Sequence, residues 1–119
     1  MSWVRADETQ DDGLSAHAMA VLAAVEKIPR GYVMSYGDLA EYVGSGTGRT
    51  VGAVLSRYGY DPLPWHRVVR SSGDPAPSQP QEALRLLRAD GTPMRGDRVD
   101  MRKARWDGVD AGGEGGPDG

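Results

Sequence analysis

Apolar residues recur three and four positions apart in four stretches of the chain, at residues 15–28, 35–44, 49–58 and 78–91. This spacing brings the apolar side chains onto one face of an α-helix, which can then pack against a core. The pattern therefore predicts four amphipathic helices. The second and third flank the glycine-rich segment 44–48, which is the outline of a helix-turn-helix, although any small helical hairpin has the same pattern.

Polar residues at the start of these stretches predict where the helices begin. Ser15 precedes the first stretch, where its hydroxyl can cap the helix. Ser35 with Asp38, and Ser78 with Gln81, have the spacing of a capping box, in which two side chains satisfy free N–H groups of the first turn. We therefore expect helices to begin after Ser15, Ser35 and Ser78.

Short β-prone runs lie between and after the helical stretches. Residues 32–34 suit a strand stub, and residues 65–69 suit a loop that ends in a short strand. Residues 98–101 alternate between polar and apolar, which is typical of an edge strand. The whole pattern predicts a mainly α fold with short β strands.

The charge of the chain divides unevenly along its 119 residues, a length that suits one domain. The formal net charge is -3, yet residues 1–13 carry four acids and one base, and residues 107–119 carry four acids and no base. We expect a basic domain at residues 14–107, a flexible acidic N-terminus at residues 1–13 and a disordered glycine-rich tail at residues 108–119.

The residue types present exclude several kinds of chemistry. The chain contains no cysteine, so it has neither a disulfide nor a thiolate nucleophile, and we expect no metal or other cofactor. Residues 1–13 contain no long apolar run, which argues against a signal peptide or a membrane anchor. We therefore expect a soluble cytoplasmic protein with no membrane partner.

One face of the third predicted helix is almost free of bulky side chains. Arg49, Gly52, Ala53 and Ser56 share this face, and Arg49 lies at the N-terminal end, where the helix dipole favours phosphate. A face of small residues can approach duplex DNA closely. It can equally let a neighbouring helix pack close, with the arginine in solvent.

Three motifs decide between these interpretations, because together they resemble a known family. They are Ser35-Tyr36-Gly37, Arg49-Thr50-Val51-Gly52 and Pro64-Trp65-His66-Arg67-Val68. In this order and spacing, over residues 16–90, the chain resembles the DNA-binding domain of the O6-alkylguanine-DNA alkyltransferases, a winged helix-turn-helix fold. That family has an alkyl-accepting cysteine where this chain has Trp65. The substitution resembles that of the alkyltransferase-like proteins.

The resemblance implies roles for particular residues. Tyr36 is expected to press on the phosphate 3′ to a damaged guanine and help to rotate the nucleotide, while Arg49 enters the base stack in its place. The resemblance places the third helix in the minor groove. The implied DNA contacts are Tyr36, Arg49, Thr50, Gly52, Ala53 and Ser56, and the implied lesion pocket consists of Tyr36, Trp65, His66, Arg67 and Val68.

The chemistry of these residues argues against an enzyme. The indole of Trp65 has no ionisable atom that can attack a carbon, so His66 has no nucleophile to activate and suits a structural hydrogen bond. Arg67 suits a role in bracing the loop. Residues 74–81 contain no cation, so a lid formed there lacks an arginine that senses the base electrostatically.

The resulting hypothesis is a non-enzymatic, monomeric, nucleoid-associated sensor that binds duplex DNA containing O6-alkylguanine by nucleotide flipping and marks it for nucleotide excision repair proteins. The alternative is a winged-helix DNA-binding module, regulatory in function, that recognises no lesion. A base-removing enzyme such as a glycosylase has little support, since the chain has only two histidines and no well-framed catalytic Asp or Lys.

Overall fold

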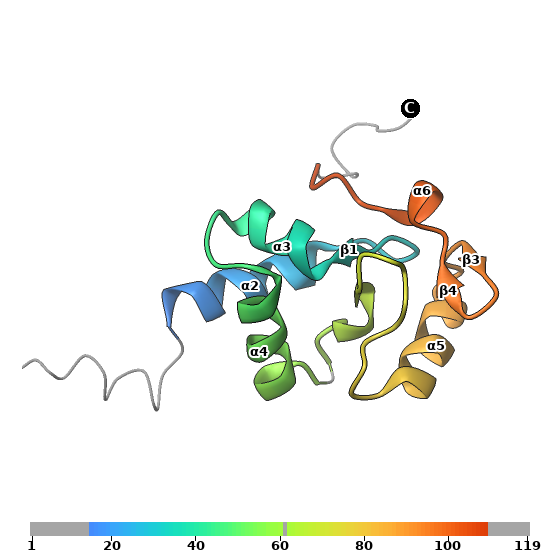
Figure 1. Cartoon of the computed structure of the whole chain (residues 1–119), viewed down its shortest axis with the longest axis horizontal. Coiled ribbons are helices and arrows are strands. Elements are labelled where there is room, and N and C mark those ends of the chain that lie inside the picture. The colour runs from blue at the N-terminus through green and yellow to red at the C-terminus, as the bar shows by residue number, and fades with distance from the viewer. Residues whose placement is uncertain (1–14, 61, 110–119) are drawn as a thin grey trace, which may run out of the picture.

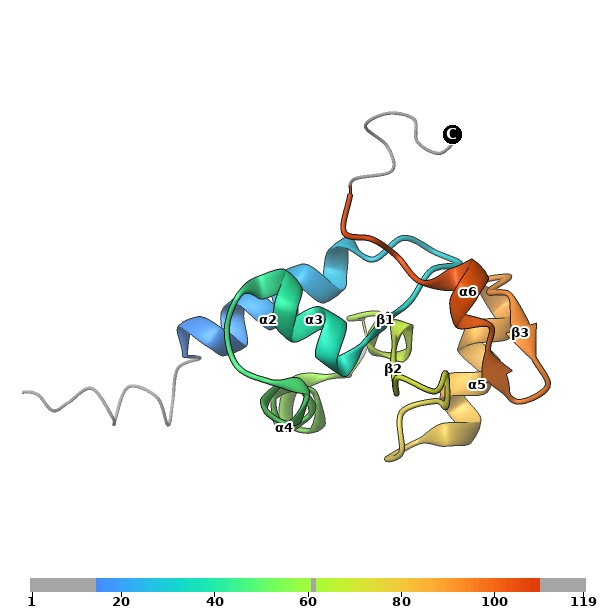
Figure 2. The same cartoon turned by 45° about the horizontal axis from the view of Figure 1, so that its top comes forward.

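The computed structural model describes residues 15–60 and 62–109. In chain order the elements are α2 (Ala16–Lys27), β1 (Met34–Ser35), α3 (Tyr36–Val43), α4 (Gly48–Tyr58), the 3-10 turn η1 (Trp65–Arg67), β2 (Val68–Val69), α5 (Pro80–Ala89), β3 (Met94–Arg95), β4 (Arg98–Val99) and α6 (Met101–Ala104). Helices α2, α3 and α4 form one group, and α5, α6 and the β3–β4 hairpin lie at the other end of the molecule (Figures 1 and 2). The predicted mainly α fold with short strands is confirmed.

Side-chain caps fix where the first three described helices begin. The Ser15 hydroxyl accepts the backbone N–H of Ala18 at 3.0 Å, as expected for the start of α2. At the start of α3 the Ser35 hydroxyl accepts the Asp38 N–H at 3.0 Å, and the Asp38 carboxylate accepts the Ser35 N–H at 3.3 Å. Gly44 ends α3 in the left-handed conformation that glycine adopts most easily. The first capping box and this helix end are confirmed.

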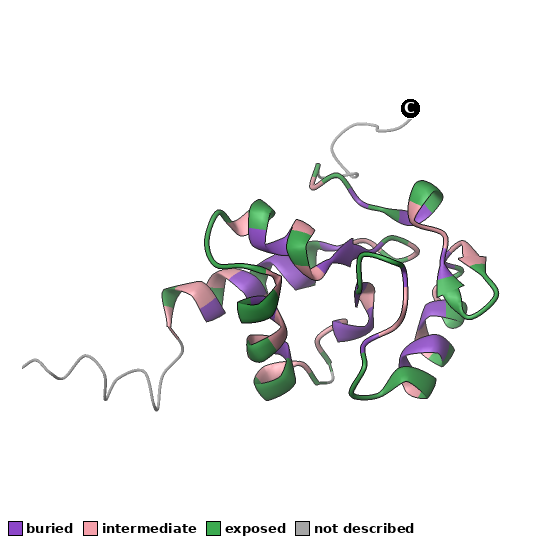
Figure 3. Ribbon diagram, in the orientation of Figure 1, coloured by how far each residue is buried: buried purple, intermediate pink, exposed green. Residues whose placement is uncertain are grey.

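The main core fills the space between α2, α3 and α4 (Figure 3). Its members include Val21, Val25, Leu39 and Val51, which the helical spacing placed on buried faces. Trp106 also belongs to this core. Its backbone N–H donates to the Val33 carbonyl at 2.8 Å, and this bond holds the C-terminal segment against the rest of the fold.

Two small sheets connect this core to the other end of the molecule. Strand β1 pairs with β2 in parallel, with Met34 opposite Val68 and Ser35 opposite Val69. Strands β3 and β4 form an antiparallel hairpin. A second buried cluster lies between them and consists of Val33, Val69, Leu87, Val99 and Ala104. The β1–β2 pair therefore holds the segment that begins at Trp65 against the start of α3.

Two local predictions are wrong. Helix α5 begins at Pro80 with Gln79 as its N-cap and without a side-chain cap, so Ser78 and Gln81 form no capping box. The residue before a proline avoids the helical region, which prevents an earlier start. The strand predicted at residues 98–101 ends at Val99, because the Asp100 carboxylate caps α6 by accepting the N–H of Arg102 at 3.1 Å.

The predicted domain limits at residues 13 and 107 stay predictions. The flexible N-terminus at residues 1–13 and most of the tail lie outside the described residues. At the C-terminal end the Val109 carbonyl accepts the indole N–H of Trp106 at 2.9 Å, so defined contacts continue past residue 107, where we expected the domain to end. In the described part of the chain, no helix combines the length and the apolar character needed to cross a membrane.

Candidate functional site

A cavity of about 570 Å³ opens between the start of α3, one face of α4 and the chain on either side of β2. This volume lies in the range of small-ligand sites. The described residues that line it are Ser35, Tyr36, Gly37, Gly48, Gly52, Leu55, Ser56, Gly59, Trp65, Arg70, Ser71, Ala76, Pro77 and Ser78. The cavity therefore brings together Tyr36, the small residues of α4 and Trp65, which are far apart in the sequence.

Tyr36 is held at the rim by the first turn of α3. The Ser35–Asp38 capping box fixes this turn, and the half-buried Tyr36 ring packs against the main core. Burial raises the pKa of Tyr36, while the charge of the Arg70 guanidinium acts in the opposite direction. The phenol is therefore protonated at neutral pH and can donate a hydrogen bond to a phosphate oxygen.

Trp65 forms an aromatic wall of the cavity. It is 7% exposed and packs against Ala76, Ala83 and Leu86, while its ring meets that of His66 edge-on, with 6.1 Å between the ring centroids. No described residue accepts a hydrogen bond from the indole N–H. The cavity is thus walled here by the exposed part of a fixed aromatic ring, which is mostly covered by its neighbours and carries no nucleophile.

The small-residue face predicted for α4 meets the cavity at Gly52 and Ser56, whereas Arg49 and Ala53 do not line it. Arg49, Ala53 and Ser56 are exposed, and Gly52 is half-buried. A side chain at Gly48 would place its Cβ 3.3 Å from the backbone nitrogen of Gly37, so glycine here lets α4 approach the start of α3. The Arg49 guanidinium has no acidic partner among the described residues and is free to bind an anion.

Thr50 has partners within the protein. Its hydroxyl accepts the N–H of Thr47 at 3.0 Å and donates to the Thr47 carbonyl, so the two residues cap α4. His17 of α2 lies 3.0 Å from the same hydroxyl and 2.8 Å from that of Ser45. Thr50 is exposed, and its hydroxyl stabilises the turn that presents Arg49.

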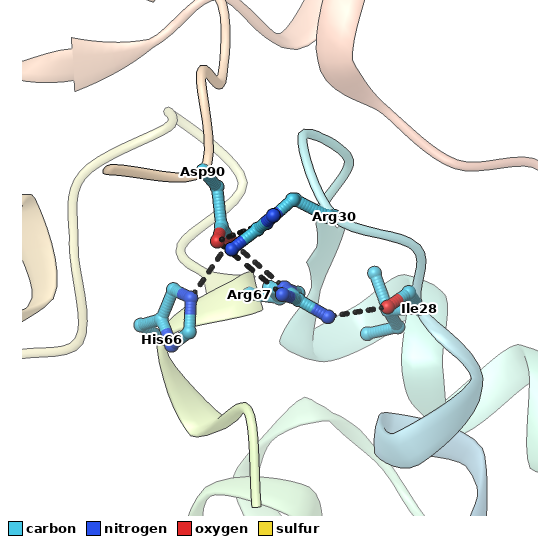
Figure 4. A network of polar contacts seen from close by, with 5 residues as sticks. All are labelled: Ile28, Arg30, His66, Arg67 and Asp90. Carbon is cyan, nitrogen blue, oxygen red and sulfur yellow. Dashed lines mark hydrogen bonds and ion pairs between the residues drawn. The ribbon is translucent and has the colours of Figure 1, made fainter. Parts of the chain in front are cut away.

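The loop that carries Trp65 is braced from behind by a buried carboxylate. Asp90, the C-cap of α5, lies 2.8 Å from His66 Nε2 and accepts hydrogen bonds from Arg67 Nε and Nη2 at 2.9 and 3.3 Å (Figure 4). Arg67 Nη1 also donates to the Ile28 carbonyl at 2.9 Å, and Arg30 approaches the carboxylate from the solvent side at 3.5 Å. Burial alone would raise the pKa of Asp90, but the hydrogen bonds from Arg67 and His66 hold it below its usual value.

This network determines where three residues of the predicted lesion pocket lie, and their role in that pocket stays a prediction. His66 and Arg67 point toward Asp90, and Val68 is fully buried in β2, so none of the three lines the cavity (Figure 4). The sequence motif does not indicate which of its side chains face the cavity, because adjacent residues of a 3-10 turn point in different directions. The hydrogen-bonding role expected for His66 and the bracing role expected for Arg67 agree with the contacts that each makes.

Arg70 is the functional candidate that sequence reasoning missed. It follows β2 directly and is the one charged residue among the described residues of the cavity lining. The prediction that the lid lacks an arginine considered residues 74–81 alone, whereas the fold brings in a cation from just upstream. The only signal in the sequence is a basic residue directly after a buried strand.

Residues 16–92 match the family described as 6-O-methylguanine DNA methyltransferase, DNA binding domain. The DNA base-flipping protein of Escherichia coli is 36% identical over 102 residues, which cover 82% of this chain and 77% of that protein. The methylated-DNA-protein-cysteine methyltransferase of Methanothermobacter thermautotrophicus is 34% identical over 87 residues, which cover 71% of this chain and 49% of that protein.

Solved structures show the same similarity in three dimensions. The crystal structure of S. pombe Atl1 in complex with damaged DNA containing O6-carboxymethylguanine superposes with a TM-score of 0.65 at 27% identity, covering 76% of this chain and 94% of the other. The crystal structure of the O6-methylguanine methyltransferase of Mycobacterium tuberculosis gives a TM-score of 0.57 at 28% identity, covering 64% of this chain and 48% of the other.

Proposed function

The chain belongs to the family of the 6-O-methylguanine DNA methyltransferase DNA-binding domain as an alkyltransferase-like protein, and from this we propose that it binds O6-alkylguanine in duplex DNA. In this proposal the damaged nucleotide leaves the helix and enters the cavity between Tyr36 and Trp65. The protein holds the lesion without removing the alkyl group, and nucleotide excision repair proteins process the complex.

The observation that carries the proposal is the position of Trp65 in the wall of the cavity. An indole face that is fixed by buried neighbours provides an apolar surface for an aromatic base or an added alkyl group. It cannot accept the alkyl group, and the chain has no cysteine that could do so elsewhere. A bound lesion therefore remains intact, which suits a sensor that acts through other proteins.

The geometry of α4 suits the flipping step. Arg49 is exposed and has no acidic partner among the described residues, so its side chain can enter the space left by an extruded base. Gly52 and Ser56 line the cavity beside it, so the helix presents little bulk where DNA must approach. An O6-alkylguanine pairs poorly with cytosine, so its extrusion costs less than that of guanine.

A binding titration tests the proposal. We expect a duplex with one O6-methylguanine to bind more tightly than the same duplex with guanine at matched salt. Arg49→Ala should reduce this preference by about 1–3 kcal/mol, because it removes the group that replaces the base. Arg57→Ala is the matched control, since Arg57 is an exposed arginine in the last turn of the same helix.

Equal affinities of the wild-type protein for the two duplexes would contradict lesion recognition. They would favour a winged-helix module that binds DNA without a flipped base, and in that case Trp65→Phe should leave binding unchanged. Loss of the alkyl group or of the base during the titration would contradict the sensor and indicate an enzyme. Sedimentation of the complex checks the expected ratio of one protein monomer to one duplex.

A further inference from the structure

A second concave surface adjoins the cavity. A groove of about 710 Å³ lies between the turn after β2, the β3–β4 hairpin and α6. Its lining consists of Ser71, Ser72, Asp74, Arg95, Asp97, Arg98, Val99, Asp100, Met101 and Arg102. Ser71 lines both the groove and the cavity. A DNA strand that leaves the cavity past this residue would therefore reach the groove next.

The acidic residues of the groove already have partners. The Asp97 carboxylate accepts a hydrogen bond from Arg88 of α5 at 2.7 Å, and this arginine is not part of the groove lining. The Asp100 carboxylate caps α6. Asp74 accepts the hydroxyl of Ser72 at 2.6 Å. Of these donors only Arg88 brings a positive charge into the groove from outside its lining, whereas the Ser72 hydroxyl and the Arg102 backbone N–H are neutral.

Two of the three arginines of the groove are, in contrast, available to bind an anion. Arg95 and Arg102 have no acidic partner among the described residues, and both are exposed. Arg98 contacts Asp74 at 3.2 Å in a pair whose side chains are 61% and 43% exposed, so water competes with this contact. Two unpaired guanidinium groups, Arg95 and Arg102, thus border a concave surface whose described lining contains no aromatic side chain on which a base could stack, and Arg98 beside them is paired with Asp74.

We propose that this groove binds backbone phosphates of the DNA strand that carries the flipped nucleotide. The proposal rests on the proposed function, because it assumes that a nucleotide occupies the adjoining cavity. Guanidinium groups bind phosphate through paired, charge-assisted hydrogen bonds, and such contacts add affinity without reading the sequence. The groove contributes to binding strength, and the cavity alone distinguishes the lesion from guanine.

The test compares two double variants of the full chain that remove the same charge. Arg95→Ala with Arg102→Ala changes the groove, whereas Lys27→Ala with Lys103→Ala removes two exposed cations that lie outside it. Affinity for O6-methylguanine and guanine duplexes is measured from about 50 to 200 mM salt. The slope of log affinity against log salt should fall by roughly 2 for the arginine variant, since each phosphate contact contributes about 0.9.

The arginine variant should also bind both duplexes at least about tenfold more weakly at the lower salt concentration, with the lesion preference unchanged. The proposal is overturned if the arginine variant and the lysine variant have the same slope and affinity. If the two variants agree in this way and the lesion preference is intact, the phosphate-binding role of the groove is rejected and the proposed function stands. A wild-type protein without lesion preference rejects the proposed function, whatever the slopes of the variants. Thermal unfolding of both variants confirms that they fold.

A shortened duplex gives a second, independent readout. Removing base pairs from one side of the lesion at a time should abolish the difference between the wild-type protein and the arginine variant on one side only, because the groove lies on one side of the cavity. A difference that persists with both shortened duplexes would mean that the arginines act through general charge, and would overturn the proposal.

Discussion

Asp90→Ala removes the carboxylate that connects the Trp65 loop to α5. The Asp90 side chain is 7% exposed, and its carboxylate contacts His66 Nε2 and the Nε and Nη2 atoms of Arg67. Removing one partner of a buried ion pair costs about 3–5 kcal/mol, because the other charge stays buried. Arg67 is 17% exposed and keeps its hydrogen bond to the Ile28 carbonyl, so we expect the lower end, about 3 kcal/mol.

Chemical and thermal unfolding measure this loss. For a domain of this size a change of 1 kcal/mol shifts the melting temperature by about 4–8 °C, so Asp90→Ala should melt roughly 12–24 °C lower than the wild-type protein. Arg67→Ala should cost a similar amount, and the double variant should cost less than the sum, because each single change removes the same interaction. A loss below about 1 kcal/mol for Asp90→Ala, or strict additivity, would refute the reasoning.

The same carboxylate predicts a dependence of stability on pH. Burial disfavours the charged form, but the hydrogen bonds from Arg67 and His66 outweigh it and lower the pKa of Asp90 in the folded protein. The contribution of Asp90 is therefore present above the unfolded pKa of about 3.9 and is lost as the pH falls through the lower folded value. The stability difference between the wild-type protein and Asp90→Ala should shrink below about pH 4.

Three further predictions concern other parts of the molecule. Gly73→Ala should lower the urea midpoint far more than Gly91→Ala, because both glycines are left-handed but only at Gly73 would a Cβ overlap the Val99 carbonyl oxygen. Arg70→Ala should weaken binding to O6-carboxymethylguanine at least about tenfold more than to O6-methylguanine in competition titrations, because a guanidinium-carboxylate hydrogen bond is worth about 1.5–3 kcal/mol. Arg105→Ala should cost about 1 kcal/mol on unfolding in urea, because it removes a bidentate ion pair in which Arg105 is 60% and Asp38 16% exposed.

Local signals in the sequence predicted most of the helical fold. The spacing of apolar residues and the Ser35–Asp38 box are short-range features, and both fix α3 where it was expected. The start of α5 was misplaced because the restriction that Pro80 imposes on its predecessor outweighs a capping-box spacing. The burial of Trp106 was missed because nothing near it in sequence indicates its pairing with Val33.

The sequence indicated the lining of the cavity best where residues share the surface of one element. Gly52 and Ser56 of the predicted small face of α4 both line the cavity, because helical periodicity determines which side chains share a face, and Tyr36 lines it from α3. The structural hydrogen bond expected for His66 is present, but its acceptor could not be predicted, since Asp90 is distant in sequence. Arg70 enters the cavity through the pairing of β1 with β2, which no local pattern indicates.

Determining a crystal structure of the protein bound to a duplex with one O6-methylguanine would test the central claim most directly. We predict that the modified base lies outside the helix, in the cavity between Tyr36 and the indole of Trp65, with the Arg49 side chain in the gap that it leaves. A modified base that remains stacked in the duplex, with the cavity empty and Arg49 outside the base stack, would contradict the account.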